Sequence, residues 1–208
     1  MHDRTATIDQ FLTATAARQP IPGGGSVAAL AGALAAAIGE MVLSYSIGKR
    51  DLASHEPQLK SIAHDLHRAR DLLLQLMVED QLAYAALSAI KKLPADSPER
   101  ADRLPAAVVT CIRGPQAIGA TAVAILELCD RCVEIVNHYL LSDLAVCAEL
   151  AMATVRSAIY NCRVNLVELS EPADRASIEQ SMKELSSHGL QLIQRIVPRI
   201  WARHESSK

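Results

Sequence analysis

The sequence predicts an all-α protein, folded as a single up-and-down bundle of long helices that covers residues 1–208. Half of the residues are hydrophobic but only 3% are aromatic, so aliphatic side chains and alanine must fill the core. That composition suits packed helices better than a β-sandwich, which favours aromatic and β-branched residues. Apolar residues recur at helical spacing in almost every segment, and the connections between the segments are short. No internal repeat or low-complexity tail indicates a domain boundary.

The first three expected helices have recognisable ends. A short helix covers residues 7–18, and a long one covers residues 26–47, where Gly48 is the natural stop. Alanine and glycine remove bulk from most of the second helix, so neighbouring backbones can approach it closely. We expect it to be the central packed element and a candidate dimer interface. The third helix, residues 56–92, carries apolar residues at helical spacing.

The fourth expected helix begins after a polar connection. Ser97 can cap it, and Pro98 can occupy its first position, where a missing N–H costs nothing. It reaches about Asn137 and contains Pro105 and Pro115, which predict a kink or a break.

Two further helices complete the expected bundle. Ser142 caps the fifth, with Asp143 in its first turn, where a carboxylate favours the helix dipole. This helix ends near Leu169, before the sequence SEPAD, and the last helix covers residues 173–202.

Charge, cysteine content and hydropathy exclude several classes of protein. The net charge of −2 is spread along the chain, without the basic patch of a nucleic-acid-binding protein. The N-terminal residues lack the apolar core of a signal peptide, and five cysteines without an export signal indicate the reducing cytoplasm. The longest uncharged apolar run starts at Ser26 and stops at Glu40, short of the ~20 residues that cross a bilayer. We therefore expect no membrane partner.

A glycine loop precedes the alanine-rich helix, in the sequence PIPGGGSVAALAGALAAAIGEMV. It is not a phosphate-binding P-loop, because no strand precedes it and no lysine follows the last glycine. Two interpretations remain: a helix N-terminus whose free N–H groups bind a carboxylate or carbonyl oxygen, or a tight turn that lets helices pack. The residues concerned are Gly23, Gly24, Gly25 and Ser26.

Helix lengths place the polar residues at two ends of the bundle. A helix rises ~1.5 Å per residue, so the helix at 26–47 separates the glycine loop from Lys49 by ~30 Å. If the helices alternate in direction, each polar residue belongs to one end. The glycine end collects Gly23, Gly24, Gly25, Ser26, Asp80, Asn161 and Asn165, and the lysine end collects Lys49, Asn137, Ser142 and Asp143. Either one group is structural, or two subunits pack antiparallel and bring opposite ends together.

Three residues of the glycine end stand out by type. A mid-helix carboxylate such as Asp80 usually faces solvent; if it is buried, its pKa rises and it can act as a general acid or base. Asparagine is a poor mid-helix residue. Asn161 and Asn165 lie on one helix face, which indicates either a shared polar ligand or a helix–helix hydrogen bond.

Other polar motifs have simpler interpretations. Cys129 and Cys132 form a CxxC inside a helix, whereas a redox CxxC normally opens a helix after a strand, so packing is favoured. His64 and His67 have no third ligand at a suitable spacing. We expect no metal site.

Five motifs in order resemble the cyclodeaminase/cyclohydrolase family of folate enzymes, over nearly the whole chain. They are the glycine-loop block quoted above, SIGKRD, VEDQLAY, NHYLLSD and AIYNCRVNL. The resemblance implies a helical bundle that forms homodimers, with a tetrahydrofolate site near the subunit contact and no other cofactor. It implies either hydrolysis of 5,10-methenyltetrahydrofolate to 10-formyltetrahydrofolate, or closure of 5-formiminotetrahydrofolate with loss of ammonia.

The family motifs carry over residue by residue. They match the glycine loop with Ser26, then Gly48, Lys49, Asp80, Asn137, Ser142 and Asp143. The chain departs from the family at three positions: Tyr84 replaces a phenylalanine, Val136 a glycine and Tyr139 an asparagine. The last two departures fall in a connection expected to face the ligand.

We therefore predict a folate enzyme, with the hydrolase preferred over the deaminase. Asp80 or Asp143 would be the acid/base, and Lys49 would meet the glutamate tail. Asn137 and Asn161 would orient the pterin or the formyl oxygen. The alternative, suggested by the departures, is a bundle of the same fold that binds another ligand or a protein.

Overall fold

The structure is a computed structural model that describes residues 4–169 and 171–206. Over these residues it contains six α-helices, two short 3₁₀ helices and no strand, which confirms the all-α prediction. The elements are α1 (Ile8–Ala16), α2 (Gly24–Ser44), η1 (Arg50–His55), α3 (Glu56–Lys91), α4 (Pro98–Cys132), η2 (His138–Leu140), α5 (Leu141–Leu166) and α6 (Pro172–Ser206).

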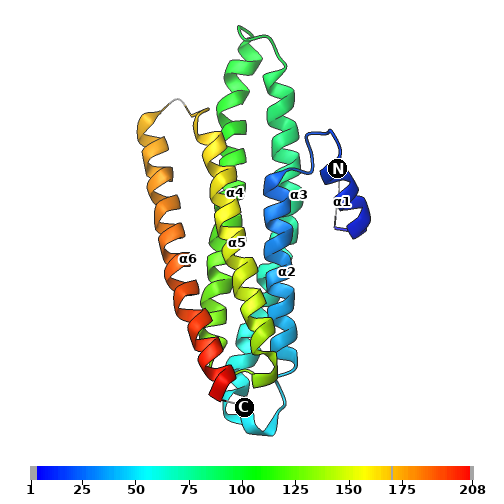
Figure 1. The fold of residues 1–208 in the computed structure, drawn as a ribbon. Coiled ribbons are helices and arrows are strands. Elements are labelled where there is room, and N and C mark those ends of the chain that lie inside the picture. Colours follow the sequence, from blue (N-terminus) through cyan, green and yellow to red (C-terminus); the bar gives the residue numbers. More distant parts are fainter. Residues whose placement is uncertain (1–3, 170, 207–208) are drawn as a thin grey trace.

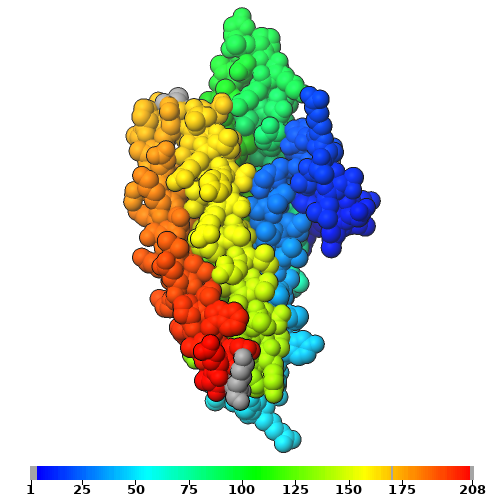
Figure 2. Space-filling model, viewed as in Figure 1, coloured from blue at the N-terminus to red at the C-terminus, as the bar shows by residue number. Residues whose placement is uncertain are grey.

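The five long helices alternate in direction, as an up-and-down bundle requires (Figure 1). Helix α2 packs between α3 and α5, α4 packs against α3 and α5, and α6 closes the bundle against α4 and α5. Helix α1 projects from the side of the bundle (Figure 2) and inserts its buried Phe11 into the core. Ser170 and the two ends of the predicted 1–208 domain lie outside the described residues.

Helix α2 is packed closely because it lacks bulk. A Cβ atom on Gly32 would lie 3.0 Å from Thr154 Cγ2, on α5. One on Gly39 would lie 3.0 Å from Leu66 Cδ1, on α3. Small residues therefore let both neighbouring helices approach, as predicted. The helix ends at Ser44, and Gly48 follows with a φ of +82°, a left-handed conformation that favours glycine.

Helix α4 runs without a break from Pro98 to Cys132, so the internal prolines Pro105 and Pro115 do not interrupt it. Pro98 occupies the first position, as predicted. Pro115 cannot donate to the carbonyl of Cys111, four residues earlier. The side-chain Nδ2 of Asn165 donates to that carbonyl instead, at 3.1 Å. A substitute donor from α5 thus compensates the proline and ties the two helices together.

Three helical segments are long and apolar enough to cross a membrane by length and composition: Gly24–Ser44, Pro98–Cys132 and His138–Leu166. The expectation that no stretch is long enough is therefore wrong, because a single charge such as Glu40 does not end an apolar segment. In the bundle, 44–56% of the residues in these windows are buried against other helices. The absence of a membrane partner stays a prediction.

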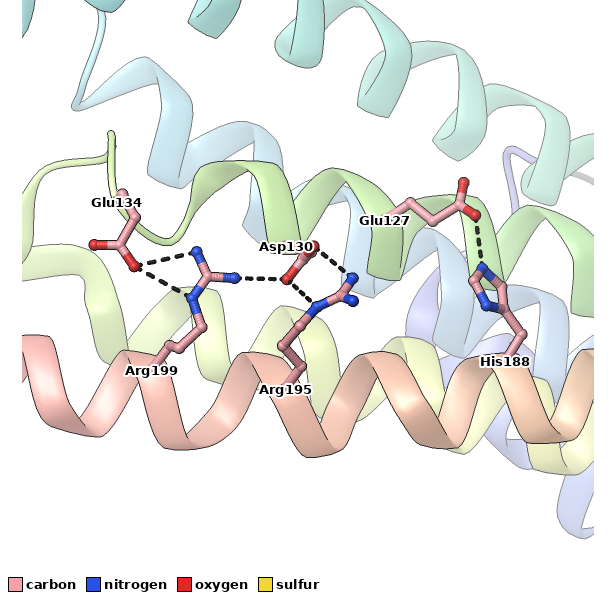
Figure 3. A network of polar contacts seen from close by, with 6 residues as sticks. All are labelled: Glu127, Asp130, Glu134, His188, Arg195 and Arg199. Carbon is pink, nitrogen blue, oxygen red and sulfur yellow. Dashed lines mark hydrogen bonds and ion pairs between the residues drawn. The ribbon is translucent and has the colours of Figure 1, made fainter.

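Charged side chains join α6 to α4 along the surface (Figure 3). Asp130 accepts hydrogen bonds from Arg195 and Arg199, each as short as 2.7 Å, and Arg199 also contacts Glu134. One helical turn further, Arg203 donates to the carbonyls of Val133 and Val136, just beyond the end of α4. Carbonyl groups at the C-terminal end of a helix have no N–H donor within the helix, so they need a partner from elsewhere.

The Arg203 contact should matter more for stability than the surface ion pairs. Arg203→Ala leaves two carbonyls without this donor, so we expect the free energy of unfolding to fall by about 1–3 kcal/mol in urea denaturation. Arg195→Ala removes an exposed ion pair and should change stability little. Equal losses for the two variants would contradict this assignment.

Candidate functional site

The N-terminus of α2 lies against polar side chains from two other helices. Gly23 is the N-cap residue and provides no side-chain cap. A Cβ on Gly24 would lie 2.7 Å from Asn161 Oδ1, on α5, and one on Gly25 would lie 2.0 Å from Asp80 Oδ1, on α3. Gly24 and Gly25 are therefore required for the close approach of α3 and α5 to the start of α2. Both interpretations of the loop hold: it lets helices pack, and a carboxylate lies at the helix N-terminus.

Asp80 is half-buried beside this loop. Ser26 Oγ donates to Asp80 Oδ2 at 2.8 Å. Burial raises the pKa of the Asp80 carboxyl, and the hydrogen bonds from the Ser26 side chain and backbone oppose that rise only in part. Asp80 is therefore partly buried, rather than facing solvent as most mid-helix carboxylates do. A raised pKa makes a carboxyl a better proton acceptor and so suits it to acid–base chemistry.

The two asparagines have different surroundings. Asn165 donates to the carbonyls of Cys111 and Asn161, so it serves as the helix–helix hydrogen bond considered above. Asn161 donates to the carbonyl of Ser157 at 2.8 Å, and its Oδ1 is the atom that lies against Gly24. Asn161 therefore presents an acceptor oxygen beside the loop, while Asn165 is held by backbone carbonyls.

These residues surround a cavity of about 260 Å³. It brings together most of the residues predicted for the glycine end of the bundle. The sequence analysis did not identify several apolar residues that line this cavity. Cys111 and Pro115 could have been identified from the proline inside a helix, because the carbonyl that it leaves free needs another donor, here Asn165. The lining residues are Pro20, Ile21, Gly23, Gly24, Gly25, Asp80, Tyr84, Cys111, Pro115, Asn161, Val164 and Asn165.

The lysine end of the bundle is held mainly by internal contacts. The backbone N–H of Asn137 donates to Ser46 Oγ at 2.9 Å, and its Nδ2 donates to the carbonyl of Tyr45. Lys49 Nζ lies 5.8 Å from the centroid of the Tyr139 ring, a cation–π contact. Asp143 lies half-buried in the first turn of α5.

Two predictions for this end need correction. Ser142 does not cap α5, because η2 precedes the helix and Leu140 is the N-cap; Ser142 is exposed in the first turn. In addition, the two residues of this connection that depart from the family motif do not both face a ligand. Val136 is fully buried in the core, whereas Tyr139 is 73% exposed.

The two polar groups are far apart within one chain. They lie at opposite ends of α2, whose 21 residues span ~30 Å. Lys49, Asn137 and Asp143 therefore cannot contact a small ligand in the Asp80 cavity of the same subunit.

Among the described residues, no group of three or more histidine, cysteine or acidic side chains could hold a metal ion. His64 and His67 are both exposed, and His67 contacts Glu40 at 3.3 Å. Cys129 and Cys132 are buried in α4, which confirms the packing interpretation. The absence of a metal in the functional protein stays a prediction.

The raised pKa of Asp80 has a consequence for stability. Between the ordinary pKa of a carboxyl and the raised one, the folded protein keeps a proton that the unfolded chain has lost, so this group makes stability fall as pH rises through that window. We expect Asp80→Asn to remove this contribution. The stability of the variant relative to the wild type, measured by urea denaturation, should rise as the pH increases from the ordinary carboxyl pKa through the raised one. A constant difference would show that Asp80 is not desolvated.

Comparison with known proteins identifies the family. A sequence profile described as "Formiminotransferase-cyclodeaminase" matches residues 7–184. The chain belongs to this family. Its membership confirms the resemblance to cyclodeaminases and cyclohydrolases and places the chain among the enzymes of folate one-carbon metabolism.

Individual members of the family are similar over most of this chain. A methenyltetrahydrofolate cyclohydrolase of Methylorubrum extorquens is 33% identical over 183 residues, which are 86% of each protein. A formimidoyltransferase-cyclodeaminase of Gallus gallus is 30% identical over 87% of this chain, which spans only 34% of the longer chicken protein. A crystal structure of a formiminotetrahydrofolate cyclodeaminase from Thermotoga maritima superposes with a TM-score of 0.88 over 95% of this chain and 97% of that one, at 24% identity, which shows the shared fold.

Proposed function

We propose that the protein hydrolyses 5,10-methenyltetrahydrofolate to 10-formyltetrahydrofolate in the cavity at the N-terminus of α2. The observation that carries the proposal is Asp80, a partly desolvated carboxyl that lines a cavity and is fixed by Ser26. The similarity to a cyclohydrolase over 86% of both chains favours hydrolysis over deamination.

The chemistry needs little covalent participation by the protein. The methenyl bridge is an electron-poor amidinium carbon, so a positioned water can add to it. Asp80 would take a proton from that water as the new C–O bond forms. The C–N bond to N5 then breaks, N5 receives a proton, and one proton is released overall. Asn161 Oδ1 and the free N–H groups of the first turn of α2 would orient the ligand.

We further propose that the protein is an antiparallel homodimer, because one chain cannot bring both polar groups together. An exposed apolar stripe runs along α2 through Val27, Leu34 and Met41, which are seven residues apart and lie on one face. It is symmetric about Leu34, so a two-fold axis there pairs Val27 with Met41 of the partner subunit. The surface of α2 lies beside that of α5 on one open face of the bundle (Figure 2).

In such a dimer, the lysine end of one subunit lies near the glycine end of the other. Lys49, Asn137, Ser142 and Asp143 would then approach the Asp80 cavity of the partner, which is one of the two alternatives that the sequence leaves open. The proposal includes no cofactor besides the tetrahydrofolate, no nucleic-acid or membrane partner, and a cytoplasmic location.

Deamination of 5-formiminotetrahydrofolate is the second candidate, supported by the similarity to the cyclodeaminase of Gallus gallus. The exposed Tyr139 supports a third, a bundle that binds another ligand, because tyrosine cannot copy the paired donor and acceptor of an asparagine.

Parallel assays separate the three candidates. Hydrolysis is followed by the loss of the near-ultraviolet absorbance of methenyltetrahydrofolate, and deamination by the release of ammonia from formiminotetrahydrofolate. We expect turnover of the first substrate to exceed that of the second. Faster ammonia release would favour the deaminase. No turnover of either, together with no rise in melting temperature on adding a folate, would favour a different ligand.

A further inference from the structure

A second cavity, of about 320 Å³, adjoins the candidate site between α3 and α4. The two cavities share Asp80, Cys111 and Pro115, so they meet at the proposed acid/base. Binding sites for drug-sized ligands usually measure ~300–1,000 Å³. The first cavity, at about 260 Å³, falls below that range and is small for a whole tetrahydrofolate. A ligand of that size would have to continue into neighbouring space.

Gly114, in the wall of the second cavity, has no packing role in this structure. For every other glycine within a described α-helix, an added Cβ would meet another residue at 3.3 Å or closer, whereas one on Gly114 meets nothing within 4 Å. Alanine in the helix interior would be more stable by about 0.5–1 kcal/mol. A glycine that costs stability and contacts nothing keeps open the space that a ligand would fill.

Arg113 provides a positive charge on the same wall. Its side chain is exposed, and it makes no hydrogen bond or ion pair within the part of the chain that the structure describes. Lys91, another cation near Cys111, is instead paired with Glu168 at 2.9 Å. Glu79, on the opposite wall, is likewise not paired with Arg113. A guanidinium without a partner beside open space is suited to a carboxylate.

We infer that the second cavity binds the p-aminobenzoylglutamate part of the folate, with a glutamate carboxylate on Arg113. This inference rests on the proposed function for the identity of the ligand. The aromatic ring would lie against Leu76, Ala83 and Ala117, and the pterin would occupy the glycine-loop cavity. Arg113 of the same chain, rather than Lys49, then binds the tail.

The test compares two ligands that differ only in the glutamate: 5-formyltetrahydrofolate and 5-formyltetrahydropteroate. Calorimetry should show that wild-type protein binds the first more tightly, and that Arg113→Ala weakens its binding by about tenfold without affecting the second. Glu79→Gln should tighten binding of the glutamate form, because a like charge is removed. Gly114→Leu should weaken it by filling the cavity, while the protein stays folded. Arg103→Ala is the matched control, since Arg103 lies on the same helix and pairs with Glu99 away from both cavities.

An unchanged preference for the glutamate form in Arg113→Ala, or an equal loss of that preference in Arg103→Ala or Lys49→Ala, would overturn the inference. Binding is measured separately from turnover, so the two proposals can fail independently. Binding that depends on Arg113 without hydrolysis would refute only the proposed reaction. Hydrolysis that does not depend on Arg113 would refute only the tail site.

Discussion

Asp80→Asn is expected to reduce turnover by about 100- to 10,000-fold while the protein remains folded, because general acid–base assistance is worth about that much. Asparagine has nearly the same volume as aspartate and can still accept the hydrogen bond from Ser26. It cannot take up a proton from water. Steady-state rates with saturating methenyltetrahydrofolate measure the effect, and circular dichroism and thermal melting report the fold.

Asp71→Asn is the matched control for this variant. Asp71 lies on the same helix but forms an exposed ion pair with Arg4, at 3.0 Å. It should retain wild-type turnover. If Asp80→Asn were as active as the control, the acid/base would have to be another group. Asp143, the other candidate from the sequence, would then be tested by the same substitution.

Leu34→Asp should separate the two subunits and abolish most activity. Leu34 is 53% exposed and lies at the centre of the apolar stripe on α2, so an antiparallel dimer places it next to its own copy. Two carboxylates forced together cost several kcal/mol, which raises the dimer dissociation constant by about 1,000-fold. Turnover should fall by about 100-fold, because the groups at the lysine end no longer position the substrate. Analytical ultracentrifugation measures the mass.

Leu72→Asp provides the comparison for Leu34→Asp. Leu72 is 42% exposed on α3, and it lines a polar surface with Arg68 and Gln75 rather than the stripe. It should remain dimeric and active. A fully active monomer of Leu34→Asp would show that one chain holds a complete site, and the shared-site proposal would be wrong.

The helices could be predicted because periodicity and end signals are local properties of the sequence. Thr7 and Gln10 form a capping box that starts α1, and Gly48 follows α2 in a left-handed conformation. The alternation of helix directions was enough to place Asp80 and Asn161 at the end of the bundle where the glycine loop lies. Long-range placement therefore follows from helix length together with the alternating directions.

What could not be predicted depends on contacts between helices. A break at Pro115 does not occur, because the hydrogen bond that the proline loses is offset by Asn165, a residue distant in the sequence. Ser142 was misplaced as a cap because the turn before α5 is a 3₁₀ helix. The cavity walls, and the open space beside Gly114, arise only when α3, α4 and α5 come together.

A crystal structure with a bound, non-reacting tetrahydrofolate would locate the ligand relative to Asp80. We predict that the pterin occupies the glycine-loop cavity, with the one-carbon substituent within hydrogen-bond reach of Asp80, ~2.6–3.2 Å or through one water. A folate bound elsewhere on the bundle, with Asp80 remote from the one-carbon group, would contradict it.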